Sequence, residues 1–195
     1  EDGAAISGSV AGTDADDGIA SYTLVSNVTE GILSFNTITG SYSFDVGTDF
    51  QDLALGETRN VTFTYYATDV AGDNSETKTT TITVTGTNDA PVVTATTETT
   101  EENTTLNSSV TATDVDNDTF TYSLVDDVTK GTLTFNSNGT YSFNPGTDFD
   151  SLANGASEDI TFTYKASDGS TDSSTETVTI TVTGTNDAPV VTATT

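Results

Sequence analysis

The sequence predicts an all-β protein made of two tandem antiparallel β-sandwiches with Greek-key connections. The string from Gly86 to Ala95 returns at Gly184 to Ala193, a shift of 98 positions (184 − 86), and a repeat of that length is one domain. β-branched or aromatic residues alternate with threonine, as in Val61–Tyr65, and this is the period of a half-buried strand. Turn residues interrupt these runs at short intervals, and no convincing helical pattern occurs.

Alignment of the two halves gives matched strands, in chain order Ala20–Val25 with Phe120–Val125, Gly31–Asn36 with Gly131–Asn136, Ser41–Asp45 with Thr140–Asn144, Val61–Thr68 with Ile160–Ser167, and Thr79–Thr85 with Thr177–Thr183. Roughly seven short strands per repeat are typical of a sandwich. Alternate apolar positions are expected in the core, namely Tyr22, Leu24, Leu33, Phe35, Tyr42, Phe44, Phe50, Leu53, Val61, Phe63, Tyr65, Ile82 and Val84 with their counterparts. Threonine is expected on the exposed faces.

The repeat boundaries predict one sandwich over residues 1–89, a second over 90–187, and a short segment, 188–195, that resembles the opening strand of a following repeat. Residues Glu1-Asp2-Gly3 align with Glu101-Glu102-Asn103, so the first repeat lacks the counterpart of residues 91–100. Its opening strand is therefore expected to be incomplete. An incomplete sheet edge and an additional strand are complementary, which predicts a monomer that associates head to tail at high concentration.

Composition excludes several functions. The chain has 30 acidic and 4 basic residues and a formal net charge of −26, so nucleic acid and anionic membranes would be repelled. No apolar run is long enough to insert into a bilayer. Histidine and cysteine are absent, which leaves oxygen ligands for metals and favours hard cations, above all Ca²⁺.

Acidic residues and asparagines gather in the predicted loops and between the repeats. A single Asp-x-Asp loop often only caps a turn, but the loops that carry Asp114, Asp116 and Asp168 are expected near the end where the chain enters, beside Asn88 and Asp89. Crowded carboxylates repel one another unless a cation lies between them. The candidate calcium ligands are Glu1, Asp2, Asp14, Asp16, Asp69, Asn88, Asp89, Glu101, Glu102, Asp114, Asp116, Asp118, Asp168, Asn186 and Asp187.

The order of these motifs resembles cadherin repeats. In the second repeat, Asn88-Asp89-Ala90-Pro91 is followed by Glu102-Asn103, Asp114-Val-Asp116 and Ala166-Ser-Asp168. The resemblance implies an immunoglobulin-like, cadherin-like sandwich that binds calcium between successive repeats. The bacterial VCBS-type repeat is a closer likeness over nearly the whole chain. The cadherin Leu-Asp-Arg-Glu motif has no match near residues 53–57 or 152–157, which leaves the number of calcium ions per junction open.

The resemblance implies a calcium-rigidified extender region of a long surface adhesin, exported by type I secretion like the RTX adhesins of Gram-negative bacteria. The expected partners are calcium ions and neighbouring repeats of the same chain, outside the cell. An alternative is an adhesion module that itself binds carbohydrate or protein, for which Tyr66, Tyr22 and Tyr122 are the candidate exposed aromatics. A two-carboxylate glycosidase is disfavoured, because the acidic residues lie in polar loops without an apolar pocket. We therefore expect no enzyme activity.

Overall fold

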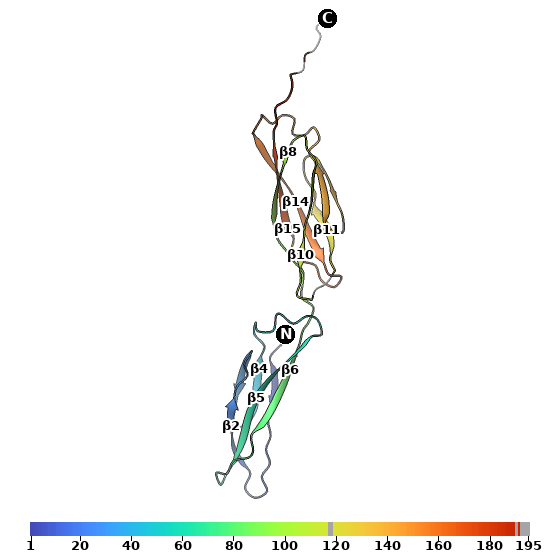
Figure 1. Ribbon diagram of the computed structural model, residues 1–195. Helices are drawn as coiled ribbons and strands as arrows, with labels where there is room; N and C mark the ends of the chain where they lie inside the picture. Colours follow the sequence, from blue (N-terminus) through green and yellow to red (C-terminus); the bar gives the residue numbers. More distant parts are fainter. Residues whose placement is uncertain (117–118, 190, 192–195) are drawn as a thin grey trace. The chain divides into compact units, whose positions relative to one another are not determined.

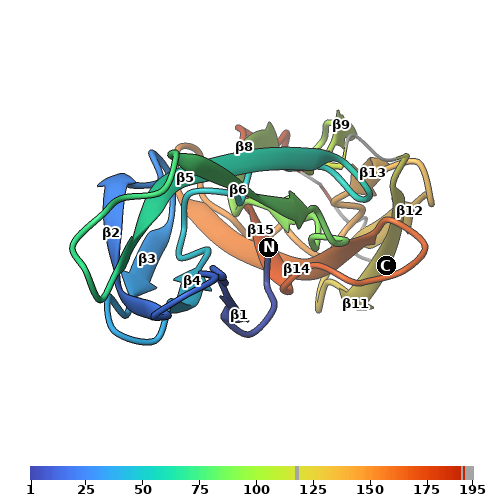
Figure 2. The same cartoon turned by 90° about the horizontal axis from the view of Figure 1, so that it is seen from below.

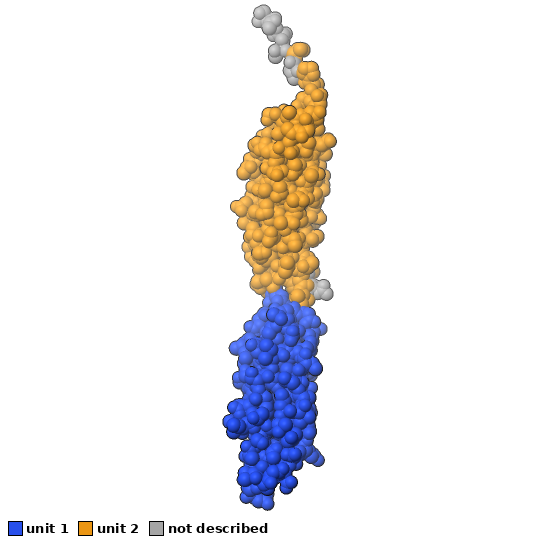
Figure 3. Space-filling model, turned by 90° about the vertical axis from the view of Figure 1, so that its left-hand side faces the viewer, with its two compact units in different colours: residues 1–89 blue, residues 90–195 orange. Residues whose placement is uncertain are grey.

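The computed structural model describes residues 1–116, 119–189 and 191. The chain divides into two compact units, Glu1–Asp89 and Ala90–Thr195 (Figures 1 and 3). The described residues form strands and turns, and none of them belongs to a helix that could span a lipid bilayer. The predicted all-β class is confirmed.

Unit 1 is a sandwich of two three-stranded sheets (Figures 1 and 2). One sheet has the order β1-β4-β3 and the other β2-β5-β6, so the chain crosses repeatedly from one sheet to the other. All pairs in unit 1 are antiparallel. The strands are β1 (Ile6–Ser9), β2 (Ile19–Ser26), β3 (Ile32–Phe35), β4 (Ser41–Asp45), β5 (Thr58–Asp69) and β6 (Lys78–Thr85).

Unit 2 repeats this plan and adds strands at its beginning. Its sheets have the orders β12-β13-β9 and β11-β14-β15-β8, with a short β10-β7 pair. The pairing of β8 with β15 is parallel, unlike the other pairs. The strands are β7 (Val92–Val93), β8 (Thr96–Glu101), β9 (Leu106–Ser109), β10 (Ala112–Thr113), β11 (Thr121–Asp126), β12 (Thr132–Phe135), β13 (Thr140–Asn144), β14 (Ser157–Ser167) and β15 (Glu176–Thr183).

Alternation along the strands builds the two cores. In β5, Val61 and Phe63 are buried while Thr62 between them is exposed, because successive side chains of a strand point to opposite faces. The sheets of unit 1 meet through aromatic edges, with the rings of Tyr42 and Phe63 5.1 Å apart and inclined by 69°. The corresponding pair in unit 2, Tyr141 and Phe162, has the same edge-to-face arrangement, which is the favoured geometry of such rings.

The predicted strands agree closely with the observed ones. The fourth strand of unit 1 and its counterpart in unit 2 have the expected bounds, and the others differ by a few residues at their ends. Each apolar residue predicted for the core of unit 1 is buried or packs against the buried cluster, which also includes Val10, Val46 and Ala67. The segment 188–195 lies mostly outside the described residues, so its assignment as an opening strand stays a prediction.

Candidate metal centres

Three carboxylates gather at the end of unit 1 where β6 finishes. Glu1, Asp2 and Asp89 each place one oxygen within 4.8 Å of the others. Glu1 is only 6% exposed; its amino group donates to the Thr85 carbonyl at 2.9 Å, and its carboxylate accepts the Thr87 amide at 2.8 and 2.9 Å. Hydrogen bonds from Gln51 and then Thr87 lower the pKa of Asp2.

A glycine sets the path of the chain to this cluster. A Cβ on Gly86 would lie 2.2 Å from the Ala54 carbonyl oxygen, so only glycine allows the backbones to approach this closely. The approach is held by Gly56 N–H donating to Gly86 O at 3.0 Å and by Gly86 N–H donating to Glu57 O at 2.8 Å. The next residue, Thr87, is thereby presented to the carboxylate of Glu1.

Unit 2 has the same arrangement around Glu102, which is 1% exposed. Its amide donates to the Thr183 carbonyl at 3.0 Å, and its Oε1 accepts the amide and hydroxyl of Thr185 at 2.6 and 2.9 Å. Its Oε2 is buried and has no hydrogen-bond partner within the described structure. A buried anionic oxygen without a donor is costly and indicates a missing cation or water.

At this glutamate, the structural correspondence between the two units is shifted by one residue relative to the sequence alignment. Alignment pairs Glu1 with Glu101, but the contacts of Glu1 with Thr85 and Thr87 match those of Glu102 with Thr183 and Thr185. The alignment is wrong at this point. The strands β1 and β9 correspond as aligned, but unit 1 has one residue more than unit 2 between the glutamate and that strand. Glu101 itself is exposed.

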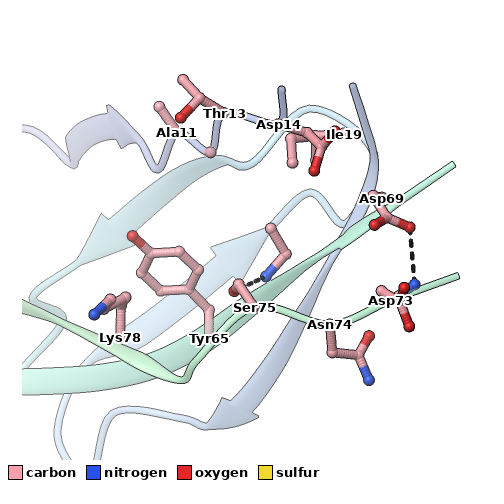
Figure 4. Close-up of a pocket in the computed structure, with 12 residues that line it drawn as sticks. Ala11, Thr13, Asp14, Ile19, Tyr65, Asp69, Asp73, Asn74, Ser75 and Lys78 are labelled. Carbon is pink, nitrogen blue, oxygen red and sulfur yellow. Dashed lines mark hydrogen bonds between the residues drawn. The ribbon is translucent and has the colours of Figure 1, made fainter. Parts of the chain in front are cut away.

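A second group of carboxylates lies where β5 ends, and there Asp14, Asp17 and Asp69 place oxygens within 4.8 Å of one another (Asp14 and Asp69 are drawn in Figure 4). The Asp14 carboxylate accepts the amides of Asp16 and Asp17 at 2.9 and 3.1 Å, and these bonds lower its pKa. Loss of hydration, followed by repulsion from Asp69 and Asp14, raises the pKa of Asp17. Asp16 is the ligand predicted from the sequence, but Asp17 completes this group.

The counterpart loops of unit 2 hold Asp114, Asp116 and Asp168. Oδ1 of Asp114 accepts the Asp116 amide at 2.8 Å, and its Oδ2 is buried without a hydrogen-bond partner in the described residues. Asp168 accepts the amides of Ser170 and Thr171 through Oδ1. Asp118 lies outside the described residues.

The asparagines of the repeated string bond to their own neighbours. Asn88 donates its side-chain amide to the Asp89 carbonyl at 2.6 Å, and Asn186 does so to the Asp187 carbonyl at 3.2 Å. These bonds shape the backbone after each sandwich, while the side-chain oxygens are the atoms that suit a cation. The predicted meeting of Asn88 and Asp89 with Asp114, Asp116 and Asp168 stays a prediction.

The four basic side chains of the protein form ion pairs with other carboxylates. Arg59 bonds to Glu30 and Asp52, Lys78 to Glu76, Lys130 to Glu158, and Lys165 to Asp172, and these are all the basic side chains in the sequence. Within the described part of the chain, none of these five ion pairs includes the carboxylates of Glu1, Glu102 or Asp114. Their donor set consists of carboxylate, amide and carbonyl oxygens, which fits a calcium ion.

Two of the three aromatics proposed for ligand binding belong to the core. Tyr22 is 8% exposed, and Tyr122 packs against the core of unit 2. Their hydroxyls accept the amides of Gly12 and Ala112 at 3.1 and 2.9 Å. Their burial agrees with the core positions that the alternation predicts for them and removes them as exposed aromatics, because the chain segment that precedes β2 or β11 folds over each ring.

Comparison with known proteins supports a cadherin-like assignment. Residues 88–184 match the family model described as "Bacterial cadherin-like domain", and no curated protein sequence matches the chain. Mouse cadherin-23 EC22-24 is similar in structure, with a TM-score of 0.56 and 20% identity over 90% of this chain and 58% of that one. Human protocadherin-24 EC1-2 has a TM-score of 0.53 and 18% identity over 86% of this chain and 82% of that one. Residues 88–184 thus resemble a bacterial cadherin-like domain, and the fold of the chain is similar to that of cadherin repeats.

Proposed function

We propose that this chain is a calcium-rigidified extender region of a long bacterial cell-surface adhesin, which projects a distal ligand-binding domain away from the cell. The coarser part of this proposal, an extracellular adhesion or repeat module, follows from the cadherin-like domain. The finer part is supported chiefly by Glu102, a buried carboxylate with one oxygen that has no hydrogen-bond partner among the described residues.

The distribution of charge supports calcium as the ligand. Unit 1 carries two groups of three carboxylates, one where β6 ends and one where β5 ends. Their mutual repulsion opposes folding, and a divalent cation would turn it into attraction. Ca²⁺ accepts six to eight oxygen ligands in flexible geometry, whereas Mg²⁺ demands a small octahedral site and keeps its waters. The absence of histidine and cysteine from the sequence leaves this chemistry as the one available.

Rigidity would arise from the ends of the repeats. Calcium bound by residues such as Glu102, Asp89 and Asp114 would restrict the short segments that connect consecutive sandwiches, and a short linker otherwise bends freely. Binding also stabilises each fold by about 2.7 kcal/mol per site when free calcium is about 100 times the dissociation constant. Calcium would therefore shift the chain further toward the folded state where the ion is plentiful, because metal binding and folding are linked.

Melting and scattering measurements on the full chain test this proposal. In millimolar calcium we expect a melting temperature well above that in chelator, and a larger maximum dimension with less spread in small-angle scattering. Magnesium at the same concentration should reproduce little of either effect. Equal melting temperatures and equal scattering in calcium and chelator would refute the role of calcium, and equal effects of the two ions would refute selective sites.

A further inference from the structure

The interfaces inside the two sandwiches are nearly interchangeable. Each unit has a first half, β1 to β4 or β9 to β13, and a second half, β5 and β6 or β14 and β15. Across this division the rings of Phe35 and Phe63 lie 5.9 Å apart and are inclined by 65°, and those of Phe135 and Phe162 lie 5.9 Å apart and are inclined by 67°. Strand β2 also pairs with β5 in the register in which β11 pairs with β14. The core therefore gives a first half little preference for the second half of its own unit.

The path of the chain permits an exchange of halves between the two units. In unit 2, the residues just after β15 meet the residues just before β9, because the Thr185 amide donates to the Glu102 carboxylate at 2.6 Å. Residues 86–105 could therefore join β6 to β9 within one mixed sandwich, while β1 to β4 pack with β14 and β15 in the other. Misassembly of this kind is a characteristic failure of tandem repeats during folding.

An ion pair joins the two halves in each unit, and its polarity is reversed between the units. In unit 1, Arg59 near the start of β5 donates at 3.2 Å to Glu30, which lies in the turn between β2 and β3. In unit 2, Lys130 stands at the position of Glu30, and it donates to Glu158 at the position of Arg59. The first half thus carries the anion in unit 1 and the cation in unit 2.

The surroundings of the two ion pairs are alike, although the cation comes from opposite halves. The Arg59 guanidinium lies 5.8 Å from the ring centre of Phe50, and the Lys130 ammonium lies 5.6 Å from that of Phe149, the corresponding residue. The four charged side chains are 30–42% exposed, and an ion pair that is open to solvent contributes little to stability. The reversal therefore matters less for the stability of a unit than for the choice between matched and mismatched halves.

We propose that the reversed ion pairs direct each first half to the second half of its own unit. In the mixed sandwiches Arg59 would lie opposite Lys130, and Glu30 would lie opposite Glu158. Both attractions would become repulsions in the same molecule, so the mixed form is disfavoured at two places at once. Exchange between two copies of the chain is not affected, because halves of the same unit then meet with their native charges.

Reversal of the ion pair in unit 2 alone tests the proposal. Lys130→Glu combined with Glu158→Lys gives unit 2 the polarity of unit 1 and keeps the net charge. Because the sequence has no cysteine, dyes can be attached through Ile38→Cys and Val70→Cys, which are exposed positions in different halves of unit 1. After refolding from denaturant, single-molecule energy transfer is high in native molecules and lower in mixed ones, whose dyes lie in different sandwiches. We expect the mixed fraction to increase about 3- to 10-fold in the reversed variant, independently of protein concentration.

Two further variants separate charge matching from other effects of the substitutions. Glu76→Lys with Lys78→Glu reverses an ion pair that lies within one half, so the mixed fraction should stay at the value of the unmodified chain. Adding Glu30→Lys and Arg59→Glu to the reversed variant restores opposite polarities, with Asp52→Ser to remove the second carboxylate beside position 59. The mixed fraction should then return to the low value.

Equal mixed fractions in the unmodified, reversed and doubly reversed chains would overturn the proposal, and so would an equal increase in the control. The same order of variants is expected in calcium and in chelator, because none of the substituted residues is a candidate calcium ligand. The test is therefore independent of the proposed function.

Discussion

Replacing Glu102 with glutamine separates its structural role from metal binding. Glutamine keeps the shape and one carbonyl oxygen for Thr185, but it replaces the unpartnered Oε2 with an amide nitrogen. In chelator two effects oppose each other. The two bonds from Thr185 become weaker by about 1 kcal/mol each when the acceptor is neutral, and removal of a buried anionic oxygen recovers about 1–3 kcal/mol. We therefore expect a net change in stability of at most about 1 kcal/mol.

In calcium the same substitution should be clearly destabilising. At free calcium of about 100 times the dissociation constant, a site contributes about 2.7 kcal/mol, and a roughly 100-fold loss of affinity leaves about 0.4 kcal/mol of it. The difference of about 2 kcal/mol corresponds to a fall of about 10 °C in the melting temperature of a domain of this size.

Differential scanning calorimetry of Glu102→Gln measures the change in stability in chelator and the fall in melting temperature in calcium. Glu101→Gln is the matched control, because it removes the same charge from the neighbouring exposed residue, and we expect little change in either condition. If Glu102→Gln lowers the melting temperature equally in calcium and in chelator, Glu102 is a structural residue and the argument for a cation at its Oε2 fails.

Three further predictions follow from the other sites. Asp89→Ala and Asp116→Ala should broaden the distribution of dimensions in calcium without unfolding either sandwich, and unchanged small-angle scattering for both variants would contradict their assignment as ligands. Asp17→Asn should raise the melting temperature in chelator at about pH 7, since some loss of hydration and repulsion from Asp69 and Asp14 raise the pKa of Asp17 and disfavour its ionised form in the folded state. That gain should disappear as the pH falls through the raised pKa and the carboxyl of the unmodified chain becomes protonated; a gain that persists at about pH 3 would show another cause. Tyr164→Phe should lower stability by about 0.5–1.5 kcal/mol through loss of the bond to Thr94, while Tyr65→Phe should have little effect on the chain at low concentration, which thermal melting of the two variants compares.

The strands and the core could be predicted because their determinants are local. Alternation of apolar residues with threonine specifies which face of each strand is buried, and two copies of the pattern remove most ambiguity about the strand bounds. The paired rings Tyr42–Phe63 and Tyr141–Phe162 follow from the same alternation in both units. Tyr22 and Tyr122 follow from the alternation as well, whereas the segment that covers each ring from ten residues earlier does not.

The carboxylate groups were only partly predictable, because their geometry depends on turns. Asp14 accepts the amides of both Asp16 and Asp17, and this turn brings the second of them, rather than the first, close to Asp69. The choice between Glu101 and Glu102 depends on burial against Thr183 and Thr185, which are about 80 residues away in sequence. A sequence pattern identifies such an acidic segment, but the fold decides which carboxylate is enclosed.

The repeated string has structural reasons of its own, so its repetition alone does not demonstrate a metal site. The glycine permits a backbone approach that a Cβ would block, at Gly184 as at Gly86, and the threonine after it bonds the buried glutamate. Val93 fills the core of unit 2. Metal binding has to be argued from atoms that packing leaves unexplained, such as Oε2 of Glu102 and Oδ2 of Asp114, which are buried carboxylate oxygens without a hydrogen-bond partner among the described residues. Because a packed sandwich without a ligand has no use for a buried anionic oxygen that lacks a donor, these two atoms are where calcium binding should be tested first.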